Sequence, residues 1–416
     1  MAPRKSIEIM APAGTWESLT AALQGGANSV YFGIEQLNMR ARATNNFTLK
    51  DLADVAEVCS AKNVRTYVTL NTVMFDHDMI LMRKIADGVK ANGITAVIAS
   101  DHAVIQYAHQ QGVEVHISTQ TNVTNVESVR FWSAYADVVV LARELSLVQI
   151  KHIVDTVNKD DIRGPSGELL QIEVFAHGAL CMASSGTCYL SLHSENSSAN
   201  RGACKQNCRR TFIARDSETG VEFEVDNEYL MSPKDLCTIE FLDQILATGV
   251  VVLKLEGRGR APDYVRTVTE CYREAADAVL AGSYSEDKVQ AWKTRLESVY
   301  NRGFWSGYFL GQMTDLFAKT TGSKATRTKL YIGRGEAYFA RPKVGQFRLE
   351  ANTLKKGDRV LVTGPTTGAI ETTVDSLRVD DQEVDEAQCG SVITIPMTER
   401  VRPSDKIYRF VETPQE

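Results

Sequence analysis

The feature that most constrains the fold of this chain is a regular alternation between short β-branched runs and helical patterns. The predicted strands cover residues 7–11, 28–33, 65–71, 95–100, 113–118, 137–142, 172–177 and 250–257. Because these strands are almost continuously apolar and are joined by helices, they indicate a parallel sheet covered by helices. Eight such units in about 260 residues favour a (β/α)8, TIM-like barrel. The rival, a doubly wound open sheet, is disfavoured because no glycine-rich dinucleotide fingerprint follows any strand.

A different pattern begins near residue 328. The runs become short and strand-like, as in KLYIG, RVLVTG and SVITIPM, and Gly, Asp and Pro turns separate them. This pattern predicts a small all-β domain, which we expect to be a barrel. The polar stretch 318–329 marks the joint. We therefore expect a catalytic barrel over residues 1–317, with a cysteine-rich insertion at 181–237, and a β-barrel domain over 328–416.

The bulk composition excludes several classes of protein. The chain is 44% apolar and 24% charged, which is ordinary for a globular enzyme. Its net charge of -6 gives no general attraction to nucleic acid, so RNA binding would need a local basic patch. No apolar run approaches the roughly 18 residues of a membrane span, and no export signal is recognisable. We therefore expect a cytoplasmic protein whose cysteines are not disulfide-bonded.

Polar side chains stand at the ends of several predicted strands, where a parallel barrel gathers its reactive groups. Asn71, Gln120 and Arg143 are predicted to bind substrate. His116 and His177 are candidate catalytic residues. The bland alternative for either histidine is a hydrogen-bonded structural residue, which is the commoner role at a strand end.

The last barrel strand carries Lys254, Glu256 and Arg258 at alternate positions, so all three should point the same way. Such a row is costly on a buried strand unless the charges are paired. One interpretation is a structural ion-pair layer that closes the barrel. The other is recognition of an anionic substrate, with both cations joining Arg143 against a carboxylate or phosphate. In that case Glu256 is a further catalytic candidate.

Five of the eight cysteines fall within one short segment: Cys181, Cys188, Cys204, Cys208 and Cys237. Several thiolates converging on one point is what an iron–sulfur cluster requires, and four is the usual number. Structural zinc is the alternative, although the gap between the first two cysteines suits short zinc knuckles poorly. The absence of any metal is the third possibility. Cys59 and Cys271 lie in helical patterns and are expected in the core, and Cys389 is isolated.

The segment 173–191, EVFAHGALCMASSGTCYLS, closely resembles the signature of the U32 peptidase-like family, historically called collagenase-like proteases. The segments IEIMAPAG, VHISTQTNVTN, ANRGACKQNCR, LMSPKDLC and LKLEGRGRAPDYV agree with it. The resemblance spans about residues 7–311. By motif and length, the chain is most similar to the subgroup of tRNA uridine-5-hydroxylation proteins.

This resemblance implies an iron-sulfur-dependent enzyme that hydroxylates the wobble uridine of tRNA. It implies a [4Fe–4S] cluster on Cys181, Cys188, Cys204 and Cys237, with Cys208 as a possible alternative ligand. It also implies a prephenate-type dicarboxylate cosubstrate, which would suit a cationic barrel mouth.

Two other functions remain open at this point. One is a collagenase-like peptidase, although the sequence has neither a zinc-protease helix motif nor a nucleophile elbow. The other is a non-catalytic RNA-binding protein with structural zinc. Basic residues of the β domain are predicted to contact RNA, with a solvated charged face or a dimer contact as the alternative: Lys329, Arg334, Arg341, Lys343, Arg348, Lys355 and Lys356.

Overall fold

The first part of the chain is a closed barrel of parallel strands. The computed structural model describes residues 7–42, 46–215, 217–223, 231–311, 317–318 and 322–413. The barrel strands are β1 (Glu8–Pro12), β2 (Ser29–Gly33), β3 (Arg65–Leu70), β4 (Ala96–Ala99), β5 (Glu114–Ile117), β6 (Val138–Val140), β7 (Gln171–Gly178) and β11 (Val252–Leu255). Neighbouring strands are parallel, and β11 pairs with both β7 and β1, which closes the ring. The predicted (β/α)8 fold is confirmed.

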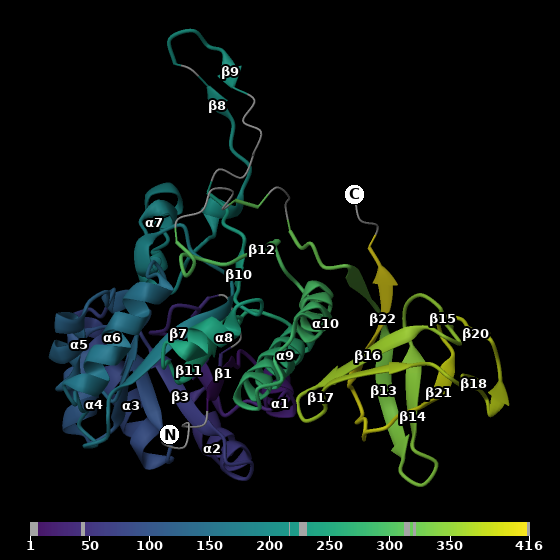
Figure 1. Ribbon diagram of the computed structural model, residues 1–416. Helices are drawn as coiled ribbons and strands as arrows, with labels where there is room; N and C mark the ends of the chain where they lie inside the picture. The colour runs from purple at the N-terminus through teal and green to yellow at the C-terminus, as the bar shows by residue number, and fades with distance from the viewer. Residues whose placement is uncertain are drawn as a thin grey trace.

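Helices cover the outside of this ring (Figure 1). They are α1 (Trp16–Gln24), α2 (Leu52–Ser60), α3 (Met79–Ala91), α4 (His102–Gln110), α5 (Val126–Ser133), α6 (Leu147–Lys159), α8 (Leu242–Ala247), α9 (Pro262–Leu280) and α10 (Glu286–Glu297). Several begin at a side-chain cap. Thr15, Asp101 and Asn125 each accept a backbone N–H of the first helical turn, which satisfies donors that the helix itself leaves unpaired.

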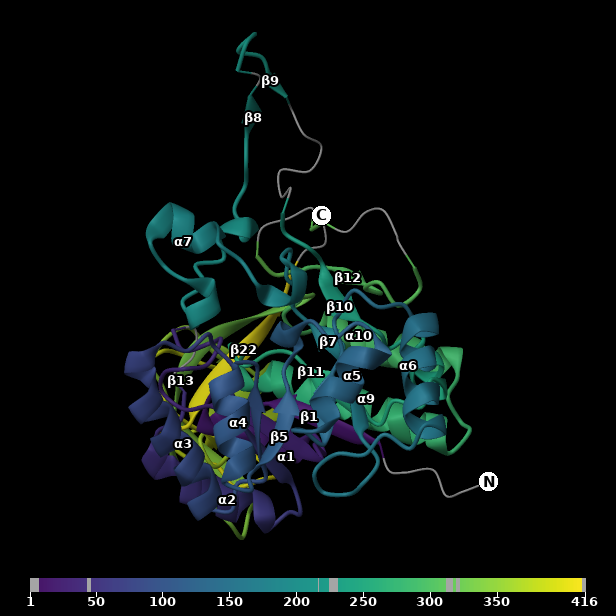
Figure 2. The same ribbon diagram turned by 90° about the vertical axis from the view of Figure 1, so that its left-hand side faces the viewer.

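The cysteine-rich segment is an excursion from the C-terminal end of β7. It contains α7 (Leu190–Glu195) and the hairpin of β8 (Ala214–Arg215) and β9 (Glu222–Phe223). The chain then returns as β10 (Asp235–Cys237), which runs antiparallel to β7, and β12 (Phe304–Trp305) adds to β10. Two perpendicular views show the hairpin projecting away from the body, with α7 near its base (Figures 1 and 2). The excursion therefore stands over the face of the barrel where the strands end.

A bulge in β7 changes the direction of its last side chains. Lys254 of β11 pairs with Phe175, but the next residue, Leu255, pairs with His177. Because side chains alternate between the two faces of a strand, an extra residue reverses the direction of those that follow. His177 consequently faces the surrounding helices, where its ring lies 5.5 Å from that of Tyr272 in α9.

The second part of the chain is all-β, as predicted. An antiparallel sheet has the strand order β17-β16-β22-β13-β14-β21-β18-β19. Its strands are β13 (Arg327–Phe339), β14 (Val344–Leu349), β16 (Arg359–Gly364), β17 (Gly368–Thr373), β18 (Arg378–Val379), β19 (Gln382–Glu383), β21 (Val392–Pro396) and β22 (Lys406–Glu412). A separate pair, β15 (Leu354–Lys355) and β20 (Glu386–Ala387), accompanies it. In the part of the chain that the structure describes, no pairing joins the end strands β17 and β19.

The β domain packs against the outer wall of the barrel. Thr20 of α1 donates a hydrogen bond to the Pro365 carbonyl at 2.7 Å, and Gln24 donates to the Thr367 carbonyl at 3.0 Å. Lys329 of β13 forms an ion pair with Asp263 of α9 at 2.6 Å. The domain thus rests on α1 and α9, at the side of the barrel (Figure 1).

Candidate functional site

One carboxylate, that of Glu256, lies at the mouth of the barrel directly after β11. The hydroxyl of Tyr31 donates a hydrogen bond to Glu256 Oε2 at 2.9 Å, and Arg40 forms an ion pair with Oε1 at 2.9 Å. Burial opposes ionisation of this carboxyl. The nearby charges of Arg40, Arg143 and Arg258 outweigh burial and bring the pKa of Glu256 down to about 2. Glu256 is therefore a fixed anion near neutral pH, which makes it a poor general base.

Two further guanidinium groups at the mouth are bonded to neutral partners. Arg258 donates from Nη1 to Asn38 Oδ1 at 3.0 Å and to Thr69 Oγ1 at 2.7 Å. Arg143 donates to the Ala179 carbonyl at 3.0 Å, and its guanidinium lies 3.7 Å from the centre of the Phe175 ring. The Nε atoms of Arg143 and Arg258 are buried without a hydrogen-bond partner. Burial lowers the pKa of Arg258 to about 10, so the side chain still carries its charge at pH 7.

The charges at the mouth do not balance. Three guanidinium groups, those of Arg40, Arg143 and Arg258, act on the single carboxylate of Glu256. Within this group of four side chains the guanidinium groups outnumber the carboxylate, and Arg143 and Arg258 are bonded to neutral groups in the contacts above. Buried positive charge is costly without a counter-ion. The mouth is therefore suited to an anionic ligand.

Lys254 lies deeper in the barrel and has a partner of its own. Its ammonium group forms an ion pair with Glu173 Oε1 at 2.8 Å, and both side chains are almost completely buried. In this structure Lys254 is part of a buried ion pair, which is the structural alternative for this row of charges, and its predicted substrate-binding role stays a prediction. Its partner was not foreseen, because the pair depends on the register between the neighbouring strands β7 and β11, in which Glu173 lies opposite Val252.

His116 also lies inside the barrel, below the mouth. Its Nε2 lies 2.9 Å from Glu114 Oε1 at the start of β5, and its ring lies 4.4 Å from that of Tyr67. Tyr67 in turn donates to Glu8 Oε1 at 2.7 Å. This network belongs to the end of the barrel opposite the mouth, so the structure does not bring His116 to the mouth as a catalytic residue.

His177 is turned away from the site by the bulge in β7. It is 1% exposed, and its ring lies among those of Tyr264, Tyr272 and Phe304. Burial, together with the charge of Arg260, lowers the pKa of His177 to about 3. The structure thus places His177 among aromatic rings away from the mouth, and its predicted catalytic role stays a prediction.

Asn71 and Gln120 meet at the mouth, as their strand-end positions predicted. Asn71 Nδ2 donates to Gln120 Oε1 at 3.2 Å and to Ser118 Oγ at 3.3 Å. The backbone N–H of Met39 donates to Asn71 Oδ1 at 3.3 Å. These amides lie beside the cationic group and offer neutral hydrogen-bonding groups to a bound molecule.

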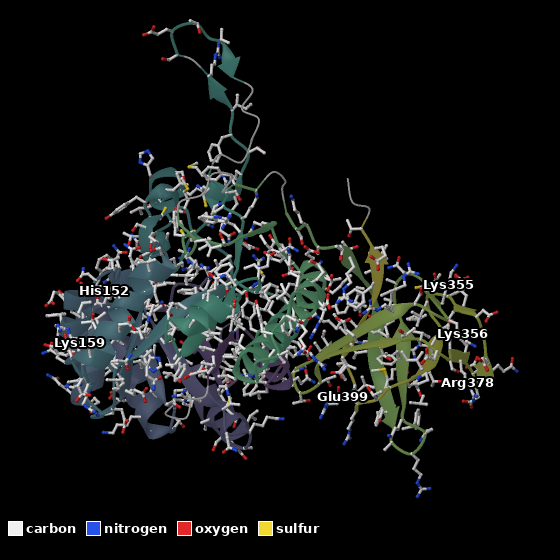
Figure 3. All side chains as sticks on the ribbon, in the orientation of Figure 1. His152, Lys159, Lys355, Lys356, Arg378 and Glu399 are labelled. Atoms are coloured by element: carbon white, nitrogen blue, oxygen red, sulfur yellow. The ribbon has the colours of Figure 1, made fainter. Side chains whose placement is uncertain are left out.

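Four of the five clustered cysteines lie near one another. Burial is the main cause that raises the pKa of the Cys208 thiol, and the neighbouring Cys181, Cys204 and Cys188 raise it further. Backbone N–H groups donate to two of these sulfurs, that of Leu190 to Cys188 and that of Gln206 to Cys204, both at 3.4 Å. Figure 3 shows sulfur atoms gathered beside α7. Neighbouring thiols, two of them hydrogen-bonded to backbone N–H groups, match the ligand chemistry of an iron–sulfur cluster.

Two observations limit this match. Among the described residues, no three His, Cys, Asp or Glu side chains are drawn together closely enough to hold a metal ion. Cys237 is 3% exposed, and it is not among the cysteines that act on the Cys208 thiol. It lies in β10 opposite His177, and the Tyr272 hydroxyl lies 3.9 Å from its sulfur. Burial raises the pKa of Cys237 to about 12. This geometry favours Cys208, the alternative fourth ligand, over Cys237.

The cysteine group is adjacent to the barrel mouth. Arg143 interacts electrostatically with the Cys181 thiol as well as with Glu256, and Arg40 interacts with the Cys204 thiol. Arg258 interacts instead with Tyr31, Glu256 and Arg40. Arg258 is therefore the cation best placed for a bound small molecule, whereas the other two face both the mouth and the thiols.

Sequence reasoning missed three residues of this site. Tyr31 could have been found from the periodicity of its strand. It shares one face of β2 with Ser29 and Gly33, and this face points into the barrel. Arg40 and Asn38 lie in the loop after β2, where no periodic pattern indicates a direction. Only the folded chain shows that they reach Glu256 and Arg258.

The basic residues proposed for RNA contact in the β domain are mostly paired with carboxylates. The pairs are Lys329–Asp263, Arg334–Glu350, Arg348–Glu336, Lys355–Glu386 and Lys356–Glu383. Figure 3 shows Lys355 and Lys356 on this domain, far from the end of the barrel where α7 lies. This arrangement favours the solvated charged face over an RNA-binding surface.

Comparisons with known proteins agree on one family. Residues 14–317 match the sequence profile described as peptidase family U32. A collagenase of Porphyromonas gingivalis is 53% identical over 97% of both chains. The tRNA hydroxylation protein P1 of Bacillus subtilis is 30% identical over 96% of this chain and 94% of its own. The 23S rRNA 5-hydroxycytidine C2501 synthase of Escherichia coli is 32% identical over 66% of this chain and 40% of its own. Among the described residues, no helix is long and apolar enough to cross a membrane.

Proposed function

We propose that this chain, which belongs to peptidase family U32, takes part in the 5-hydroxylation of the wobble uridine in tRNA. The observation that carries the proposal is the unbalanced cationic mouth beside a group of four thiols. Hydroxylation replaces a C–H bond by a C–OH bond and withdraws two electrons from the base. It therefore needs a source of oxygen and an acceptor for two electrons, and a bound cosubstrate beside a redox centre would bring the two together. Relatives named for tRNA and rRNA hydroxylation support this choice.

The chain's own residues would divide the work as follows. Arg258 and Arg143 would each grip one carboxylate of a prephenate-type dicarboxylate, because guanidinium groups bind carboxylates through parallel hydrogen bonds. Glu256, held by Arg40 and Tyr31, would keep those cations in place. Asn71 and Gln120 would hydrogen-bond the neutral part of the ligand or the base.

The thiols would hold the redox group. Cys181, Cys188, Cys204 and Cys208 would bind a [4Fe–4S] cluster, which when bound supplies one-electron transfer. The backbone N–H groups of Leu190 and Gln206 would stabilise the thiolates of Cys188 and Cys204. Zinc on the same thiols is the alternative, and chemical analysis separates the two.

The first test is chemical analysis combined with nucleoside analysis. Anaerobically purified protein should contain iron and acid-labile sulfide. Cells that lack the gene should lose 5-hydroxylated uridine from their tRNA, as measured by mass spectrometry, and the wild-type gene should restore it. Zinc without sulfide, or unchanged tRNA in the deletion strain, would contradict the proposal.

The ligand set has its own test. Cys208→Ser should reduce the iron content to background, as should Cys181→Ser, Cys188→Ser and Cys204→Ser, because a cluster with a missing thiolate is labile. Cys237→Ala should keep its iron, with the exposed Cys389→Ser as the matched control. Iron retained by Cys208→Ser and lost by Cys237→Ala would restore the ligand set that the sequence resemblance implies.

A peptidase is the second candidate, because a relative 53% identical is named a collagenase. The site residues described here provide few of the groups that peptide cleavage requires. Glu256 is held as an ion, His177 faces the helices, and the buried Cys237 thiol has a pKa of about 12. We expect no cleavage of gelatin by the iron-loaded protein. If the iron-loaded protein cleaves gelatin and Arg258→Met abolishes this cleavage, a peptidase becomes the first candidate function and tRNA hydroxylation the second.

A further inference from the structure

Two aromatic side chains are unusually exposed near the cysteine group. Phe75, in the loop between β3 and α3, is 52% exposed, and Tyr189, the residue after Cys188, is 68% exposed. Most large aromatic rings in a folded protein are largely buried. Loops that follow barrel strands lie at the mouth, so both rings stand on the rim of the site.

A single residue, Asn200, ties the two aromatic loops together. Its backbone carbonyl accepts a hydrogen bond from the N–H of Val73 at 3.1 Å. Its side-chain Oδ1 accepts one from the N–H of Cys188 at 3.0 Å. Phe75 and Tyr189 each follow within two residues of these anchored positions. The two loops that carry these rings are therefore tied to the same residue.

Phe75 is backed by a fixed guanidinium group. Arg201 lies 4.5 Å from the centre of the Phe75 ring and donates to the Val73 carbonyl at 2.8 Å. Arg201 also forms an ion pair with Asp78, and Asp78 accepts from the Phe75 N–H at 2.8 Å. These contacts hold the ring and the guanidinium together, while about half of the ring surface stays open to solvent.

Two exposed cations lie close to the segment that ties these loops together. Arg42 and Lys205 are exposed. The Arg42 N–H donates to the Gly202 carbonyl at 3.3 Å, and the Lys205 N–H donates to Ser191 Oγ at 3.0 Å. Both therefore lie next to the segment that carries Asn200 and Arg201. Exposed aromatic rings beside exposed cations are the combination that binds single-stranded nucleic acid, because bases stack on the rings and phosphates face the cations.

We propose that Phe75 and Tyr189 form a stacking rim for unpaired RNA bases that flank the base entering the barrel mouth. The inference rests on the proposed function and adds the contacts by which RNA is held. A base can reach a buried site only when it is unstacked from its neighbours, and the rim would replace the lost stacking. A protein partner would use the same apolar rings, but it would have less need of Arg42 and Lys205.

The test measures RNA affinity by titration with a stem–loop RNA whose loop contains an unpaired uridine. Phe75→Ala and Tyr189→Ala should each weaken binding about tenfold or more, since loss of one base–aromatic stack has an effect of that order. Phe75→Tyr and Tyr189→Phe should bind as tightly as the wild type. Phe131→Ala is the matched control, because Phe131 is 57% exposed on α5.

A direct probe keeps the inference separate from the proposed function. In Tyr189→Trp, the fluorescence of the new ring should be quenched when the stem–loop RNA is added, whereas Phe131→Trp should give no signal. If the wild-type protein binds no RNA, the proposed function itself is contradicted. Wild-type protein that binds RNA, with unchanged affinity in both alanine variants and no quenching, would overturn only the stacking rim.

Discussion

The lower interior of the barrel and its mouth use the same kinds of residue in opposite ways. Below, Lys254 has Glu173 as its partner, and Glu8 pairs with Arg65 and accepts a hydrogen bond from Tyr67. Above, Arg258 and Arg143 are bonded to neutral oxygens. Both regions are buried and lie within one ring of strands. The difference between them is thus in pairing, not in burial.

This difference separates structural charge from functional charge. A buried ion pair contributes little net stability, but breaking one is expensive because it leaves a lone charge behind. A buried cation that already lacks a carboxylate partner has less to lose when it is removed. Substitutions in the two regions should therefore differ in what they damage, the fold in one case and ligand binding in the other.

The largest effect on stability should come from the lower region. Lys254→Met removes the cation and leaves Glu173, which is fully buried, without its partner. We expect the free energy of unfolding in urea to fall by roughly 3–5 kcal/mol. The double variant Lys254→Met/Glu173→Gln should recover much of this loss. If Lys254→Met were as stable as the wild type, the buried pair in the lower interior would not be structural, and the comparison with the mouth would be wrong.

A smaller effect should arise outside both regions, at His177. Its pKa is about 3 in the folded protein and roughly 6.5 in an unfolded chain. Between these values the unfolded chain binds a proton that the folded chain does not, so stability falls as the pH falls below about 6.5. From pH 7 to pH 5 the wild type should lose about 2 kcal/mol more than His177→Gln. Parallel pH profiles for the two proteins would show that His177 is not a buried neutral group.

At the mouth, removing charge should affect binding more than folding. Arg258→Met loses two hydrogen bonds to neutral groups, so we expect a loss of roughly 1–2 kcal/mol in stability. Affinity for prephenate, measured by calorimetry, should fall at least tenfold. Arg341→Met, a change in an exposed residue of the β domain, should alter neither quantity. Loss of stability as large as that of Lys254→Met would assign Arg258 to the structural layer instead.

The smallest effect is expected in the β domain. Lys355 and Lys356 form exposed pairs with Glu386 and Glu383, and such pairs are screened by solvent and salt. The double variant Lys355→Met/Lys356→Met should keep its melting temperature and its affinity for stem–loop RNA. A marked loss of RNA affinity would instead show that this domain binds RNA, as its basic composition first suggested.

The barrel could be predicted because its signal is local. Each strand is a short β-branched run, and each helix has its own period, so the alternation alone indicates the fold. The direction of His177 could not be predicted, because one extra residue in β7 reverses the alternation. The Lys254–Glu173 pair was equally out of reach, since it depends on the register between β7 and β11, which the sequence pattern does not fix.

The site was predictable in kind but not in detail. Strand-end positions correctly placed Asn71, Gln120 and Arg143 at the mouth. The cysteine spacing indicated a group of thiols, but spacing does not say which of Cys208 and Cys237 faces the others. That choice depends on β10, whose antiparallel return beside β7 buries Cys237 against Tyr272.

The return of the excursion beside the strand that it left has a practical consequence for handling this protein. Because β7 and β10 pair with each other, the residues between them form a single surface loop whose two ends are held together. Lengthening such a loop costs little, about 0.6 kcal/mol for each doubling of its length. The projecting β8–β9 hairpin, with its turn at residues 217–219, is thus a natural point at which to splice in a fluorescent reporter. A probe carried there would project away from the body of the protein without being threaded through the barrel.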